Sequence, residues 1–147
     1  MRFSVRTAVV PPPDEVFGVF GDPSFVSSVA PRFLHLEVLR IGLLVGDAIE
    51  IRMHPGFQIL WNSEIISASH DEDAIRFVDV SSDVMPWPLC AWEHHHGFER
   101  SPAGGTVIVD APRFEVRPRV LAPVVYPLMY LSFVQRRGPY RRRFGRA

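Results

Sequence analysis

Two histidines and one aspartate, His94, His96 and Asp110, have the types and spacing needed for acid–base chemistry or for hydrogen bonding inside a protein. Side chains two positions apart on a β-strand point to the same side, so His94 and His96 would share one face of a strand. Asp110 would lie on the next strand, within reach of cross-strand pairing. The same faces carry the apolar residues Trp92, Phe98, Ile108 and Phe114. We therefore predict that the three polar side chains line an inner, mostly apolar wall.

Several chemical roles are open to this wall. A buried histidine hydrogen-bonded to Asp110 would serve stability alone, because a buried polar group without a partner costs about 1–3 kcal/mol. The wall could also hold the hydroxyl or carbonyl group of a ligand, or Asp110 could orient a histidine that moves a proton during catalysis. Two histidines and a carboxylate could bind a metal ion. No helical His-Glu motif accompanies them, so we expect no metal ion and no cofactor.

The composition indicates one globular domain over residues 1–147. Of the 147 residues, 47% are hydrophobic and 22% are charged, which is enough apolar material for a core. A single cysteine, Cys90, excludes a disulfide framework and a cysteine-based zinc site. We see no signal peptide, and the longest apolar run, Val120 to Val134, is too short to span a membrane. We therefore expect a cytoplasmic protein.

The formal net charge is zero, but the charges are unevenly distributed. From Arg117 onward there are eight arginines and no acidic residue. The Arg-rich tail, from about residue 138, could be a solvated helix end in which arginines complement the helix dipole. It could also meet an anionic membrane surface. Nucleic acid is the weakest interpretation, because no recognised nucleic-acid-binding motif accompanies the charge.

Hydrophobic periodicity predicts an α+β fold. A first strand at 3–9 is followed by short helices at 14–20 and 23–29, both of which begin near a proline. Six further strands are predicted around residues 34–38, 49–53, 57–65, 75–79, 90–100 and 105–116. Their short connections favour antiparallel pairing. A final helix should begin near Val124, so that Pro127 lies in its first turn, and should stop or kink at Gly138-Pro139.

Short motifs in a characteristic order suggest a family. They are Pro12-Pro13-Asp14-Glu15-Val16-Phe17, Asp22-Pro23, Ala30-Pro31, Trp61 with Ile65, Phe77-Val78-Asp79, the run from Trp92 to Phe98, and Gly104-Gly105-Thr106 with Asp110. Together they resemble the START-like, or SRPBCC, superfamily, which includes polyketide cyclases, lipid-transfer START domains and the birch-pollen allergens. The resemblance covers about residues 3–137. One departure is Trp87-Pro88-Leu89, where the family usually has Gly-Pro-aromatic.

The resemblance implies a helix-grip fold. In this fold a curved seven-stranded antiparallel sheet wraps a long C-terminal helix, and two short helices lie between the first two strands. An apolar cavity between sheet and helix would bind or transport a small hydrophobic molecule such as a lipid, a polyketide or an aromatic compound. We expect ligand contacts from Trp61, Phe77, Trp87, Trp92, Phe98, Ile108, Phe114, Leu128 and Met129.

Two alternatives to a binding protein remain. The first is an enzyme similar to polyketide cyclases or dehydratases, with His94, His96 and Asp110 as its acid–base residues. The second is an interaction module with a vestigial cavity, in which the Arg-rich tail meets an anionic partner.

Overall fold

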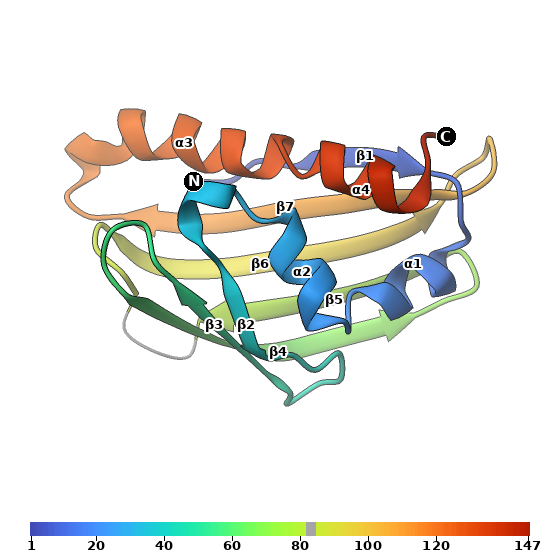
Figure 1. The fold of residues 1–147 in the computed structure, drawn as a ribbon, viewed down its shortest axis with the longest axis horizontal. Coiled ribbons are helices and arrows are strands. Elements are labelled where there is room, and N and C mark those ends of the chain that lie inside the picture. Colours follow the sequence, from blue (N-terminus) through green and yellow to red (C-terminus); the bar gives the residue numbers. More distant parts are fainter. Residues whose placement is uncertain (82–84) are drawn as a thin grey trace.

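The structure is a computed structural model that describes residues 1–81 and 85–147. Its centre is a seven-stranded antiparallel sheet with the strand order β1-β7-β6-β5-β4-β3-β2 (Figure 1). The strands are β1 (Val5–Val9), β2 (Glu37–Arg40), β3 (Ala48–Met53), β4 (Ile59–His70), β5 (Ala74–Ser81), β6 (Leu89–Arg100) and β7 (Thr106–Val116). This arrangement confirms the predicted α+β, helix-grip-like architecture.

Two short helices, α1 (Pro13–Val19) and α2 (Pro23–Val29), follow β1, as predicted. Each begins with a proline, whose missing N–H is not needed in the first helical turn. The Asp22 carboxylate accepts a hydrogen bond from the backbone N–H of Ser24 at 2.9 Å and so caps α2. A 3-10 turn, η1 (Arg32–Leu34), then leads into β2.

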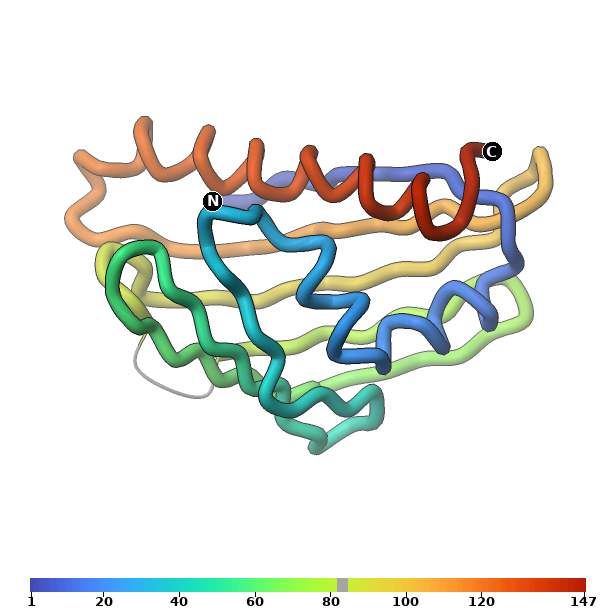
Figure 2. Tube along the Cα trace, viewed as in Figure 1, coloured from blue at the N-terminus to red at the C-terminus, as the bar shows by residue number. Residues whose placement is uncertain are grey.

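The C-terminal segment consists of a 3-10 turn, η2 (Arg119–Leu121), and two helices, α3 (Ala122–Val134) and α4 (Arg137–Phe144). The predicted start near Val124 is wrong, since α3 begins at Ala122 and contains Pro127. The predicted stop at Gly138-Pro139 is also displaced. The helix breaks two residues earlier, so Pro139 falls in the first turn of α4, where it is tolerated. The two helices run almost end to end along the sheet (Figure 2).

The residues predicted as an Arg-rich tail therefore form most of helix α4. Tyr140 and Phe144 of this helix are buried, and Arg141, Arg142 and Arg143 are exposed. Among the described residues, no helix has both the length and the apolar character needed to cross a membrane.

The inner surface of the sheet has two parts. We call the part covered by α1, α2 and α4 the closed half; its side chains are buried and largely aromatic. They include Val16, Phe20, Phe25, Phe77, Phe98, Ile108, Tyr140 and Phe144. Phe98 lies 4.8 Å from Phe20 and 5.6 Å from Phe17, measured between ring centroids. This half is a packed core.

We call the part at the end of the sheet under α3 the open half (Figure 1). Phe114 and Phe133 are buried there, but several other apolar side chains remain partly exposed: Met53, Trp61, Trp92, Val125 and Met129. Helix α3 rests on the edge of the sheet, where Phe3 packs against Tyr126, Tyr130 and Phe133. The open half therefore has apolar residues facing inward without the dense cover of the closed half.

Candidate functional site

The predicted polar wall lies at the boundary between the two halves. The register of the strands brings its residues together. His94 of β6 lies opposite Asp79 of β5, and His96 of β6 lies opposite Asp110 of β7. The register of β6 and β7 follows from their tight turn, where Gly105 has a φ of 75° and a Cβ would collide with the carbonyl oxygen of Val9. The predicted inward orientation of His94, His96 and Asp110 is confirmed by their burial and mutual contacts.

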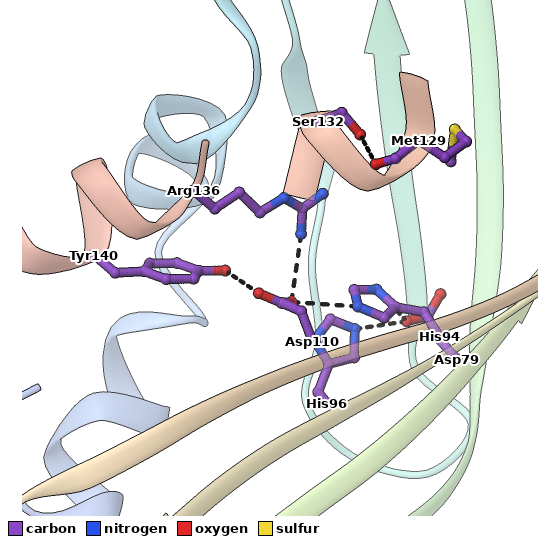
Figure 3. Close-up of polar contacts among 8 residues, drawn as sticks. All are labelled: Asp79, His94, His96, Asp110, Met129, Ser132, Arg136 and Tyr140. Atoms are coloured by element: carbon purple, nitrogen blue, oxygen red, sulfur yellow. Dashed lines mark hydrogen bonds and ion pairs between the residues drawn. The ribbon is translucent and has the colours of Figure 1, made fainter. Parts of the chain in front are cut away.

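The closest polar contacts run diagonally between strands (Figure 3). His96 Nε2 lies 2.9 Å from Asp79 Oδ2. His94 Nε2 lies 3.3 Å from Asp110 Oδ1, and its Nδ1 lies 3.9 Å from Asp79 Oδ2. Both nitrogens of His94 therefore face a carboxylate. The two imidazole rings are also in contact, with centroids 3.7 Å apart.

Two residues of the C-terminal helical segment, which lies over the sheet, complete the cluster. Arg136, at the junction of α3 and α4, places Nη1 3.5 Å from Asp110 Oδ1. The Tyr140 hydroxyl donates a hydrogen bond to Asp110 Oδ2 at 3.0 Å (Figure 3). The Arg136 guanidinium also lies 3.8 Å above the Phe133 ring, in cation–π contact. We define the polar cluster as Asp79, His94, His96, Asp110, Arg136 and Tyr140.

Sequence reasoning did not find Arg136 and Tyr140. It considered the C-terminal arginines only as a tail that is solvated or meets an anionic partner, and it placed Tyr140 in that tail. A usable signal was present, since residues 133, 136 and 140 recur with the helical spacing of one face. Asp79 has the same strand parity as Phe77, and the structure places its carboxylate near both histidines.

Burial and neighbouring charges determine the protonation states of His94 and Asp110, the central pair of the cluster. Burial, together with the neighbouring His96, lowers the pKa of His94 to about 4, even though both carboxylates act in the opposite direction. Burial alone would raise the pKa of Asp110, but His94 and the Arg136 guanidinium outweigh it and lower the pKa to about 2. At neutral pH a neutral imidazole therefore faces an ionised carboxylate.

The outer members of the cluster are also fixed by their neighbours. Burial disfavours the charged form of Asp79, but contact with His96 and His94 outweighs it and holds the pKa of Asp79 below its usual value. Burial and the Asp110 charge raise the pKa of Tyr140 well above its ordinary range. Tyr140 is therefore a permanent hydrogen-bond donor, and it positions Asp110.

The geometry limits what the cluster can do chemically. His94 is fully enclosed, so proton exchange with a bound molecule would involve His96, whose side chain remains 13% exposed. One nitrogen or oxygen atom from each of Asp79, His94 and His96 lies within 4.8 Å of the others, a donor set that zinc accepts. Within this set His96 already contacts Asp79 at 2.9 Å, and His94 Nδ1 lies 3.9 Å from the same carboxylate oxygen.

The predicted ligand-contact residues fall into three groups. Phe77, Phe98, Ile108 and Phe114 are buried in the packed interior, and Trp61, Trp92 and Met129 lie partly exposed in the open half. Trp87 and Leu128 are 75% and 62% exposed. This exposure argues against the expected ligand contacts of both residues, since Trp87 lies in the turn before β6 and Leu128 lies on the outer face of α3.

Two of the hollows on the surface of the described residues have volumes of about 600 and 260 Å³. Both are lined mainly by side chains on the outer face of the sheet, including Glu93, Arg113 and Glu115 in the larger and Ser67 and His95 in the smaller. Neither coincides with the predicted cavity between the sheet and the C-terminal helix, which remains a prediction.

Comparison with known proteins shows the fold. The chain has a helix-grip-like fold, and solved structures of several bacterial proteins have the same fold. A crystal structure from Chromobacterium violaceum matches with a TM-score of 0.70 at 15% identity, over 100% of this chain and 99% of the other. One from Thermus thermophilus matches with a TM-score of 0.70 at 18% identity, over 97% and 96%.

The crystal structure of Ara h 8.0201 also matches, with a TM-score of 0.55 at 13% identity over 94% of this chain and 95% of the other. No protein-family model and no curated protein match the sequence. At these identities the similarity establishes the fold alone, and function has to be argued from the side chains.

Proposed function

We propose that this protein binds a small, mostly apolar molecule on the open half of the inner surface, with a hydroxyl or carbonyl group of the molecule directed at the polar cluster. The observation that carries the proposal is a row of partly exposed rings that ends at a buried polar group. Trp61 contacts Trp92 at 5.1 Å between centroids, and Trp92 contacts His94 at 5.7 Å.

The apolar part of the ligand would cover surface that this protein leaves in contact with water. Each Å² of apolar surface removed from water contributes about 25 cal/mol before the costs of association. Trp61 and Trp92 offer flat faces for an aromatic or polycyclic ligand. Met129 of α3 adds a side chain that adapts to irregular shapes.

The polar cluster would select the ligand's polar group. Arg136, with a side chain 22% exposed, and His96 are the members that a ligand could reach. Two carboxylates, Asp79 and Asp110, oppose one guanidinium, so the cluster has no excess positive charge. A carboxylate or phosphate is therefore disfavoured, and a neutral hydroxyl or carbonyl is favoured.

The test uses the neutral fluorescent probe N-phenyl-1-naphthylamine. We expect saturable binding to the purified protein, with energy transfer from tryptophan to the probe. Trp92→Ala should weaken binding by about tenfold or more, because a hot-spot aromatic residue contributes at least 1–2 kcal/mol. Trp87→Ala is the matched control, because the Trp87 side chain is 75% exposed in the turn before β6; it should leave binding unchanged.

Equal affinities in the two variants would refute the proposal, as would a failure of the wild-type protein to bind the probe. Native mass spectrometry of the purified protein gives an independent check. A bound molecule lost in the Trp92→Ala variant and retained in Trp87→Ala would support the proposal and give the mass of the ligand.

A further inference from the structure

Helix α3 has an apolar stripe on its outer side that the fold does not use. Val120, Val124, Leu128 and Leu131 are each at least 60% exposed. Their spacing of four, four and three residues places them on one helical face. We call these four residues the outer stripe. It includes Val120 from the preceding turn η2 and runs along the length of α3.

The stripe is not required for packing. Helix α3 packs on the sheet through other residues, above all Phe133, which is buried against Phe3 and His94. Contiguous exposed aliphatic residues are uncommon on a monomer and mark a surface that meets a partner. Tyr126 and Tyr130 lie on the other side of α3, where they contact Phe3 at the edge of the sheet.

The charges around the stripe indicate what that partner is. Arg117 and Arg119 precede it, and Arg141, Arg142 and Arg143 follow it on the exposed surface of α4. The sequence has no acidic residue after Glu115. An apolar helix face with arginines at both ends matches an anionic lipid surface, whose headgroups attract the arginines while the acyl region takes up the aliphatic side chains.

A second copy of this chain fits the stripe less well. If two stripes packed antiparallel, the arginines at the start of one would meet those at the end of the other. The segment supplies no carboxylate to neutralise them. Like charges brought together in this way oppose association.

We propose that the outer face of α3 and α4 adsorbs to anionic membranes, with the outer stripe inserted at the boundary between headgroups and acyl chains. Helix α3 has 13 residues and is therefore about 20 Å long, so it would lie in the plane of the membrane. In Figure 1, α3 and α4 lie end to end along the top of the molecule, so one side of the molecule could engage both. This inference does not depend on ligand binding by the open half.

The experiment is vesicle flotation with the full chain, using phosphatidylcholine alone or with about one third phosphatidylserine. We expect the wild-type protein to float with the anionic vesicles only, and less at high salt. The double variant Leu128→Ser/Leu131→Ser should lose at least tenfold in partitioning. The variant Arg141→Gln/Arg142→Gln should lose several-fold.

The matched control is Leu44→Ser/Val45→Ser. These two aliphatic residues are as exposed as the stripe but lie in the β2–β3 connection; the change should not affect flotation. All substitutions are at the surface, and thermal melting verifies that each variant folds. Three results would overturn the proposal: no flotation of the wild type with anionic vesicles, equal loss in stripe and control variants, or a stripe variant that changes only the oligomeric state measured by light scattering.

Discussion

The two halves of the inner surface are formed by the same strands, yet only one of them is sealed from solvent. In the closed half, rings from three helices meet rings from the sheet, and Phe98 is completely buried. In the open half, Trp61 and Trp92 face the same way as Phe98 but stay partly exposed. The strands therefore supply an apolar inner face in both halves. Only where helices cover this face do its side chains form a packed core.

The two halves differ in burial because α3 and α4 direct different side chains toward the sheet. Helix α4 inserts Tyr140 and Phe144 between the sheet and α2, with Phe144 and Phe25 centroids 5.4 Å apart. Helix α3 instead turns Leu128 and Leu131 outward. The polar cluster lies where one helix gives way to the other, and Arg136 occupies the break between them. The packed closed half thus positions the polar cluster next to the partly exposed apolar side chains of the open half.

The largest expected effect tests the packing contrast. Phe98→Ala should lower the free energy of unfolding by about 3–5 kcal/mol, because the ring is fully buried and its removal leaves a cavity. Met129→Ala, in the open half, should cost about 1 kcal/mol or less, since its side chain is partly exposed. Urea unfolding at neutral pH measures both. Similar losses would show that the two halves are equally packed.

The next largest effect is a pH dependence of stability that arises from His94 in the polar cluster. His94 is neutral in the folded protein until its pKa of about 4, compared with 6.5 for a free histidine. Between these values the unfolded chain binds a proton that the folded chain does not, so stability falls as pH drops from about 6.5 to 4. The shift corresponds to roughly 3 kcal/mol at most. Below that window, protonation of Asp110 removes further stability as pH approaches its pKa of about 2.

Urea unfolding at pH 7, 6, 5 and 4.5 would show this slope. We expect His94→Gln to be less stable at pH 7 but to have a flatter pH dependence. His95→Gln is the control on the same strand, because His95 is half-exposed on the other face; it should keep the wild-type slope. A slope unchanged by His94→Gln would mean that another group drives the pH dependence.

The strands and their faces could be predicted from sequence because their pattern is local. Trp92 and Phe98 share the parity of His94 and His96, and Ile108 and Phe114 share that of Asp110, so burying these large apolar side chains fixes which face of each strand turns inward. The prediction therefore oriented His94, His96 and Asp110 correctly. Cys90 shows the limit: a shift in pairing between Leu89 and Ala91 leaves it exposed, although its parity with Trp92 suggested burial.

The helical half of the site could not be predicted in the same way. Where α3 ends depends on how Pro127 and Pro139 are accommodated, and a shift of two residues moves Arg136 from a solvated end to the centre of the cluster. Leu128 was assigned to the interior because an apolar helical residue usually faces the core. Helix α3 is apolar on both sides, so periodicity could not distinguish its inner face from its outer face.

The smallest expected effect compares one substitution in the two helices. Tyr140→Phe removes a buried hydrogen bond to an ionised carboxylate and should cost about 1.5–3 kcal/mol. Tyr126→Phe, on α3, removes an exposed hydroxyl that lies 3.4 Å from the carbonyl oxygen of Arg2, and its cost should stay within about 0.5 kcal/mol. Both losses are measured by urea unfolding at neutral pH. If Tyr140 positions Asp110, its loss should also let His94 titrate differently, which histidine NMR signals would report. Equal losses of stability for the two tyrosine variants, with unchanged histidine signals, would show that Tyr140 of α4 does not position Asp110. The cluster would then depend on the strand residues alone.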